Sequence, residues 1–228
     1  MKTVSSRQRA FTLVELIVVV AVLGLLATLV VRAQNEPETQ ARAWRIRCIN
    51  NIKQIGLGFR IWSNDHGDKF PMQYGADKQG SKEAIESGET WRHFQVMSNE
   101  LVTAKLLTCP ADDRVRLTNS WNLSVTNVSY FVGLDADESL PQMLLSGDRN
   151  VTNGFALQKG VIELEDMPPV GWTQTIHNEQ GNVGLADGSA QQFTTALLRR
   201  QIAAANKQNK IGITRVQLPV EMAGARKK

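Results

Sequence analysis

The feature that most constrains this chain is an apolar run from Phe11 to Val31 that contains one charged residue, Glu15. At 1.5 Å per helical residue, these 21 residues span about 31 Å, which matches the hydrocarbon core of a bilayer. The run therefore predicts a transmembrane helix. The alternative is a secretory signal peptide cleaved near Ala27, although the apolar core of a signal peptide is usually shorter.

The residues before the run predict its orientation. Lys2, Arg7 and Arg9 precede it, and the first ten residues contain no acid. The positive-inside rule then places the N-terminus in the cytoplasm and residues 33–228 on the far side of the membrane. Without these three residues, the 26 basic residues fall to 23, against 22 acidic ones. The basic composition therefore comes mainly from the N-terminus, and we expect no nucleic-acid partner.

Glu15 needs an explanation because a carboxylate inside a bilayer costs on the order of a few kcal/mol. In one interpretation it lies close enough to the end of the span to reach the headgroups. In the other, cleavage between Ala10 and Phe11 leaves an amino group one helical turn from Glu15. In a stack of parallel helices, that amine could neutralise the carboxylate of a neighbouring subunit. A buried charge that is satisfied only in the assembly would set the register between subunits.

The segment Ala10-Phe11-Thr12-Leu13-Val14-Glu15-Leu16-Ile17 resembles the processing site of type IV pilins and type II secretion pseudopilins. The resemblance implies that a prepilin peptidase removes the leader and methylates Phe11, and that Glu15 mediates assembly. The family usually has glycine at the position of Ala10, and alanine is also small. This motif is confined to the N-terminus, so it identifies a route of export and assembly rather than the task of the remaining residues.

The apolar run is expected to continue as a second, amphipathic stretch of helix. Proline removes a backbone donor, so Glu36-Pro37-Glu38 predicts a kink. Apolar residues then recur at spacings of three and four, at Ala41, Trp44, Cys48, Ile52, Ile55, Phe59 and Trp62. That stripe predicts one helix face packed on a globular head. The predicted parts are a basic leader (1–10), a transmembrane and assembly helix (11–31), its amphipathic continuation (32–63) and a head (64–228).

The head is predicted to contain both helices and strands. The helical segments are 83–86, 91–107 and 195–205, and the strands are 127–134, 142–146, 160–164 and 211–218. Residues 182–193 predict a hairpin, because Asp187-Gly188 suits a tight turn with positive φ. We therefore expect an α+β, pilin-like fold in which a long kinked N-terminal helix packs on a small antiparallel sheet.

A second resemblance lies in the head. His177 and Asp187-Gly188 are similar to an H-x9-DG signature near the C-terminus of a large group of bacterial prepilin-like proteins. Further similar segments are Cys48-Ile-Asn-Asn-Ile-Lys-Gln-Ile-Gly-Leu, Asp68-Lys-Phe-Pro71 and Cys109-Pro110. A base oriented by a carboxylate is one interpretation of the histidine and aspartate. However, we find no nucleophile motif and no zinc-type ligand spacing beside them. We expect a structural role, with the histidine bonded across the hairpin, and leave a metal or partner site as the alternative.

The two cysteines, Cys48 and Cys109, would both face an oxidising compartment. Two outcomes remain open: a disulfide between them, or a buried free thiol at Cys48 on the helix stripe. A bridge would close a loop of about 60 residues and contribute about 4 kcal/mol in the chain-entropy model.

No cofactor and no metal site is predicted. Acidic residues cluster at 65–68, 112–113 and 135–138, but none of these segments matches an EF-hand. Calcium is a candidate ligand only because the major pseudopilin of type II secretion binds it. The best cluster for it is Asp135, Asp137 and Glu138.

The sequence leaves two main functions open. The first is a non-enzymatic pilin or pseudopilin subunit of the bacterial inner membrane, which polymerises with other subunits after prepilin peptidase has processed it. Among these, a type II secretion pseudopilin is favoured over an adhesive or motility pilin. The second is a membrane-anchored periplasmic binding module that never polymerises. A third, weaker interpretation is an anchored hydrolase that uses His177 and Asp187.

Overall fold

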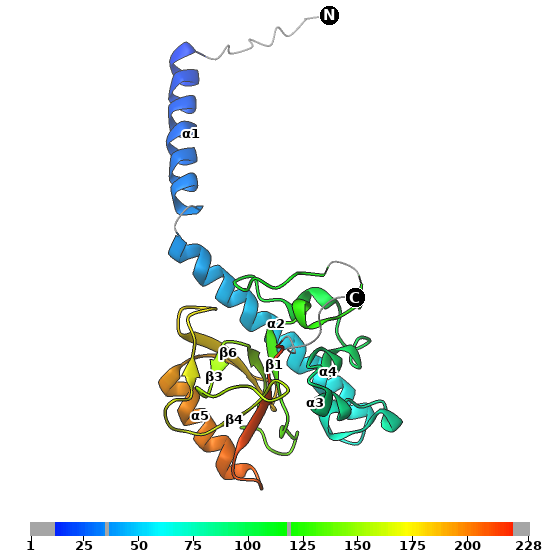
Figure 1. Cartoon of the computed structure of the whole chain (residues 1–228). Coiled ribbons are helices and arrows are strands. Elements are labelled where there is room, and N and C mark those ends of the chain that lie inside the picture. The colour runs from blue at the N-terminus through cyan, green and yellow to red at the C-terminus, as the bar shows by residue number, and fades with distance from the viewer. Residues whose placement is uncertain (1–11, 35–36, 118–119, 221–228) are drawn as a thin grey trace, which may run out of the picture. The chain divides into compact units, whose positions relative to one another are not determined.

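The computed structural model describes residues 12–34, 37–117 and 120–220. The chain divides into two compact units, Met1–Ala43 and Trp44–Lys228. The first unit contains helix α1 (Leu13–Gln34) (Figure 1). Among the described residues, α1 is the one helix long and apolar enough to span a membrane, and the candidate span is Leu13–Val31. Helix α2 (Pro37–Asp65) begins at the predicted kink position, which suits a proline in a first helical turn. The predicted processing residues, Ala10 and Phe11, lie outside the described residues.

The predicted apolar stripe of α2 is confirmed from Cys48 onward, whereas Ala41 and Trp44 are only half-buried. Cys48, Ile52, Ile55, Phe59 and Trp62 are each at most 2% exposed and belong to the main hydrophobic core. The helix also approaches its neighbours closely through a glycine, Gly58. A Cβ atom built at this position would lie 2.7 Å from Leu101 Cδ2. The residues of α2 from Trp44 onward are therefore part of the head.

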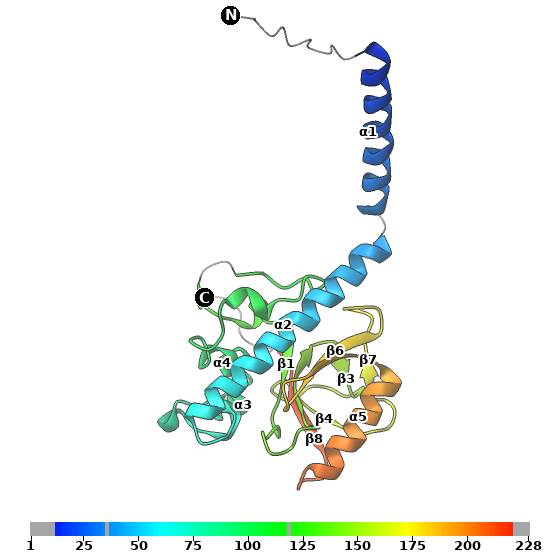
Figure 2. The same ribbon diagram turned by 180° about the vertical axis from the view of Figure 1, so that it is seen from behind.

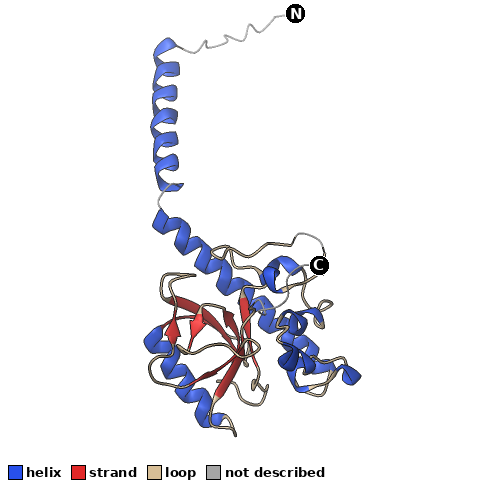
Figure 3. Cartoon of the chain, viewed as in Figure 1, coloured by secondary structure: helices blue, strands red, loops and turns tan. Residues whose placement is uncertain are grey.

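The head contains a six-stranded antiparallel sheet (Figure 3). Its strands are β1 (Tyr130–Gly133), β2 (Leu144–Asp148), β4 (Val161–Leu164), β6 (Gln180–Leu185), β7 (Ala190–Thr194) and β8 (Thr214–Gln217), in the order β4-β8-β1-β2-β6-β7. The predicted hairpin is confirmed as β6 and β7, which pair in a regular register. A second, small sheet pairs β3 (Val151–Thr152) with β5 (Gly171–Trp172). Strands of two residues are too short to leave a periodic pattern, so the sequence did not reveal them.

The two faces of the sheet are covered by different elements (Figures 1 and 2). A Cβ atom at Gly184 would meet Ile52 of α2, whereas one at Gly181 would meet the ring of Trp172 in β5. Successive strand residues point to opposite faces, so α2 and β5 lie on opposite sides of β6. Helix α5 (Thr195–Gln208) lies with β5, because the Thr195 hydroxyl accepts from the backbone N–H of Trp172 at 3.4 Å.

One predicted helix is wrong in extent. The structure has short helices at α3 (Glu83–Ser87) and α4 (Trp91–Gln95), and 3-10 turns at Pro71–Gln73, Ala76–Lys78, Ala104–Leu107 and Val125–Asn127. The predicted helix 91–107 therefore ends at Gln95. The apolar residues Met97 and Leu101 lie in irregular turns after the helix and are buried there. Thr103 is extended, and its hydroxyl accepts from the backbone N–H of Lys105, which starts a separate turn.

Candidate functional site

The first candidate site is the start of α1, where Thr12 and Glu15 bond to each other. The backbone N–H and the hydroxyl of Thr12 both donate to Glu15 Oε2 at 2.9 Å, and the backbone N–H of Glu15 donates to Thr12 Oγ1 at 3.3 Å. This reciprocal arrangement is a capping box, which satisfies donors left free at a helix N-terminus. Glu15 therefore has a role within its own chain that the sequence analysis missed, although the signal Thr-x-x-Glu is present.

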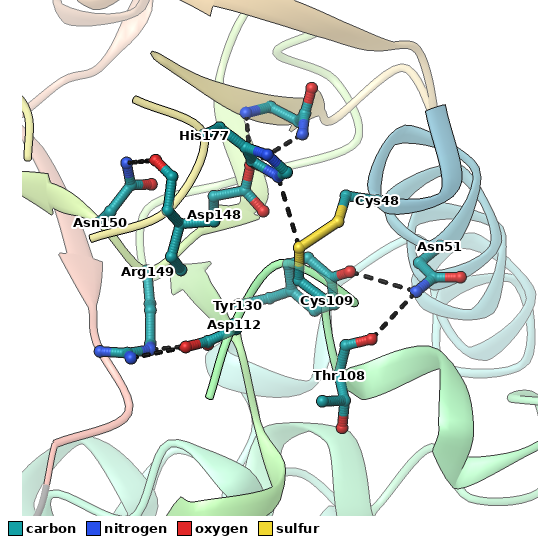
Figure 4. Close-up of a disulfide and its surroundings, with 12 residues drawn as sticks. Cys48, Asn51, Thr108, Cys109, Asp112, Tyr130, Asp148, Arg149, Asn150 and His177 are labelled. Atoms are coloured by element: carbon teal, nitrogen blue, oxygen red, sulfur yellow. Dashed lines mark hydrogen bonds and ion pairs between the residues drawn. A yellow bond between two sulfur atoms is a disulfide. The ribbon is translucent and has the colours of Figure 1, made fainter. Parts of the chain in front are cut away.

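The second candidate site is a buried group of four side chains beneath α2, which we call the Cys–His–Asp cluster: Cys48, Cys109, Asp148 and His177 (Figure 4). Cys48 and Cys109 form a disulfide with a Cα–Cα distance of 5.3 Å. The Nε2 atom of His177 lies 3.4 Å from Cys109 Sγ and 3.6 Å from Asp148 Oδ2. The four potential ligand atoms all lie within 4.8 Å of one another.

Four separate segments supply these residues. Cys48 belongs to the buried stripe of α2, and Cys109 follows the 3-10 turn Ala104–Leu107. Asp148 ends strand β2, and His177 lies in the loop between β5 and β6. No spacing within one segment of the sequence therefore predicts the cluster. Asp148 was missed altogether, and its only signal is an acid at the end of the buried strand sequence Leu-Leu-Ser-Gly-Asp.

The loop that carries His177 has an unusual backbone. His177, Asn178 and Glu179 all have positive φ, at 58°, 52° and 59°. This conformation costs a non-glycine residue about 1–2 kcal/mol, so surrounding contacts must hold it. The side-chain amide of Asn150 donates to the carbonyls at positions 173, 176 and 180, at 2.8–3.0 Å. Arg45 of α2 donates to the carbonyl of His177 at 3.1 Å.

Burial dominates the protonation of the cluster. It raises the pKa of Asp148 to about 7, although the backbone and side-chain N–H groups of Asn182 donate to Oδ2 at 2.7 and 2.8 Å and lower it. Burial, together with the charge of nearby Arg45, lowers the pKa of His177 to about 4. The imidazole is therefore neutral at pH 7. Among the described residues, Asp148 Oδ1 has no hydrogen-bond partner, which is rare for a buried carboxylate oxygen.

Polar side chains also line the region around the disulfide (Figure 4). Asn51 of α2 donates to the Tyr130 hydroxyl at 3.2 Å and to the Thr108 carbonyl at 3.3 Å. Nearby, the guanidinium of Arg149 donates to both carboxylate oxygens of Asp112, at 2.8 and 2.6 Å. Beside the disulfide, Asn51 thus joins α2 by hydrogen bonds to strand β1 and to the residue that precedes Cys109.

The structure corrects the expected contact between His177 and the Asp187-Gly188 turn. Strand β6 separates the two, and the histidine contacts the Cys–His–Asp cluster instead of bonding across the hairpin. Asp187 Oδ1 accepts from the backbone N–H of Ser189 at 2.8 Å, and Gly188 has the positive φ (86°) expected of the turn. The histidine and Asp187 therefore do not form a base–carboxylate pair.

Both ends of the H-x9-DG segment are fixed to α2. Arg45 donates to the carbonyl of His177, and Arg60 donates to the carbonyl of Asp187 at 3.2 Å. Between these two points, Ile52 faces Gly184. The segment therefore runs alongside α2 in the same direction, and its histidine and its turn mark the two ends of one helix–strand contact.

The best candidate calcium cluster has carboxylates that already accept from protein donors. Asp135 pairs with Arg215, and Asp137 accepts from Ser139. Glu138 accepts from Arg60 and from the Ser63 hydroxyl. Within the described residues, the Cys–His–Asp cluster is the one group of three or more histidine, cysteine, aspartate or glutamate side chains whose potential ligand atoms lie close together.

Residues 5–31 match the family described as the prokaryotic N-terminal methylation motif. The chain carries a prepilin-type methylation motif. Comparisons with curated proteins and with solved structures gave no significant match. The motif implies processing by a prepilin peptidase and a pilin- or pseudopilin-like role. Together with α1, it indicates anchoring in the inner membrane.

Proposed function

We propose that this chain is a structural subunit that assembles through α1 into a pseudopilus or pilus-like filament, with a type II secretion pseudopilus favoured. The observation that carries the proposal is the surface of α1. None of the span Leu13–Val31 is buried within the subunit, and the methylation motif lies at its start. Lipid covers such a surface in the membrane, and neighbouring copies of the same helix would cover it in a filament.

The proposed assembly step is non-covalent and needs no catalytic residue in the head. Cleavage after Ala10 would create an amino group on Phe11, four residues before Glu15 in the sequence. Within a single subunit this carboxylate is bonded to Thr12. During assembly, the amine of one subunit would pair with Glu15 of its neighbour and set the axial register, because a misaligned pair leaves a charge unpaired in an apolar surrounding.

The capping box allows an experiment that separates the charge of Glu15 from its hydrogen bonds. Glu15→Gln keeps a side chain that can complete the box but removes the charge. Thr12→Val keeps the charge but removes the hydroxyl that bonds to it. We expect Glu15→Gln to abolish filaments and Thr12→Val to retain them, with both variants at normal levels in the membrane. Sheared filaments and membranes would be quantified by immunoblotting in the native host.

The reverse pattern would overturn this role for Glu15. If Glu15→Gln assembles and Thr12→Val does not, Glu15 acts through helix capping and not through charge pairing between subunits. If the wild-type chain remains entirely in the membrane under conditions in which the host's filaments form, the chain is not a filament subunit.

The alternative function, an anchored binding module, has one supporting observation. An open pocket of about 550 Å³ lies where the β3–β5 sheet meets the start of α5, and its lining includes Trp172, Glu179, Gln180, Thr195 and Arg199. Small-molecule sites are usually enclosed and lined mainly by apolar side chains, so this open pocket, which has mainly polar side chains, suits only a polar ligand. Under this function, neither Thr12→Val nor Glu15→Gln would change the distribution of the protein between membrane and filament.

A further inference from the structure

We propose that the Cys–His–Asp cluster, with its disulfide reduced, holds one divalent ion of the zinc type. This inference concerns the head alone and does not depend on filament assembly. The ligands would be the thiolates of Cys48 and Cys109, the Nε2 atom of His177 and the carboxylate of Asp148. All four side chains are buried, and their ligand atoms lie within 4.8 Å of one another.

The two distances from His177 Nε2 suit tetrahedral coordination. Zinc bonds of about 2.0–2.3 Å place neighbouring ligand atoms about 3.3–3.8 Å apart. The His177 Nε2 atom already lies 3.4 Å from Cys109 Sγ and 3.6 Å from Asp148 Oδ2. The two sulfur atoms are closer only because they are covalently bonded, and reduction would let them separate to contact distance.

The four side chains are also of the chemical kinds that bind zinc, and neighbouring residues fix their positions by hydrogen bonds. Zinc prefers thiolate, imidazole and carboxylate ligands, and a structural site uses four of them. Asp148 Oδ2, the oxygen near His177, accepts from Asn182, and Oδ1 of the same carboxylate is buried with no hydrogen-bond partner among the described residues, so the carboxylate can still take a ligand bond. Asn182 orients the carboxylate through two hydrogen bonds, and Asn150 holds the loop of His177. Such outer contacts are what keep metal ligands in position.

The chemistry balances with a dithiol as reductant. It gives two electrons and two protons to the Cys48–Cys109 bond and becomes a disulfide itself, leaving two thiols in the protein. The ion then displaces both thiol protons, and any proton on Asp148, into solvent. Two thiolates, one carboxylate and one divalent cation leave a single negative charge, and the guanidinium of Arg45 lies beside the His177 carbonyl to offset it.

The ion would replace the disulfide as a cross-link. In both forms, α2 is joined to the segment that follows the 3-10 turn Ala104–Leu107, across a sequence separation of 61 residues. A chain that meets reducing conditions, or has not yet been oxidised, would therefore keep the helix attached to the sheet.

Cobalt titration of the full chain in detergent tests the proposal. The protein is reduced with a phosphine, freed of reductant under argon and titrated with Co²⁺. We expect one Co²⁺ per chain, a thiolate-to-cobalt charge-transfer band and the intense visible bands of tetrahedral cobalt, with Zn²⁺ displacing the cobalt. The oxidised protein should show none of these bands. If the reduced chain unfolds, Zn²⁺ should restore its near-ultraviolet circular dichroism.

Matched variants identify the ligands. His177→Gln and Asp148→Asn should lose the tetrahedral bands, whereas His66→Gln, which changes a histidine outside the cluster, should keep them. Asn182→Ala should weaken Co²⁺ binding by about 10–100-fold, as expected for an outer contact. The disulfide and melting temperature of each oxidised variant show whether it is folded. If a ligand variant does not fold, protection of both wild-type cysteines from alkylation by Zn²⁺ is measured in its place.

Three results would overturn the proposal. The first is a folded, reduced wild-type chain that takes up no Co²⁺ with a thiolate band. The second is a band that survives unchanged in both ligand variants. The third is an unfolded, reduced chain that Zn²⁺ neither refolds nor protects from alkylation.

Discussion

Replacing both bridged cysteines with alanine measures how strongly the disulfide stabilises the head. Cys48 and Cys109 are separated by 61 residues, and both are fully buried. In the chain-entropy model, a loop of this size restricts the unfolded chain enough to contribute about 4 kcal/mol at 25 °C. For a unit the size of Trp44–Lys228, each kcal/mol changes the melting temperature by about 2–4 °C. The double variant should therefore melt about 8–16 °C below the oxidised wild type.

The assay is thermal unfolding of the full chain in detergent, followed by near-ultraviolet circular dichroism, with a chelator present so that no metal replaces the bridge. The single variant Cys48→Ala is the matched control. It also removes the bridge, so it should melt within a few degrees of the double variant. A loss below about 1 kcal/mol in the double variant would refute the reasoning, because it would mean that packing and hydrogen bonds alone hold α2 on the sheet.

Three further predictions concern the head, each measured by urea unfolding at equilibrium. Burial lowers the pKa of His93 from its ordinary value of 6.5 to about 4 in the folded state, while its ring nitrogens bond to Ser81 and Gln217. The neutral, buried His93 ring therefore contributes stability that is fully present above pH 6.5 and falls by about 3 kcal/mol as the pH drops towards 4. His93→Gln should remove this part of the pH dependence of the unfolding free energy. An unchanged dependence in the variant would contradict the prediction. Gly188→Ala should cost about 1–2 kcal/mol because φ is 86°, and Gly188→Asn should cost less, whereas equal costs would argue against backbone strain. Phe59→Ala should cost about 3–5 kcal/mol because the ring is fully buried, whereas the neighbouring Leu57→Ala, at a side chain 57% exposed, should change stability by about 0.5 kcal/mol or less.

Much of the fold could be predicted because it depends on local patterns. The apolar run over residues 13–31 is recognised by length and composition alone, and the α2 stripe by its helical spacing. The Asp187-Gly188 pair predicts its turn because glycine adopts positive φ without steric cost. The start of α1 is equally local: Thr12 and Glu15 are three residues apart, and the pattern Thr-x-x-Glu by itself predicts their bonds.

The candidate site in the head depends on contacts between distant segments. The sequence offered Asp187 as a partner for His177 because it is the acid that the H-x9-DG signature specifies, but an extended strand carries the two apart. The actual neighbour, Asp148, is brought in by the pairing of β2 with β6, whose register places it beside Asn182. Strand order and register are decided by which faces become buried together, and no local spacing encodes them. The sequence alone thus determined the membrane helix and the buried face of α2, whereas only the tertiary structure decided which side chains meet beneath that helix.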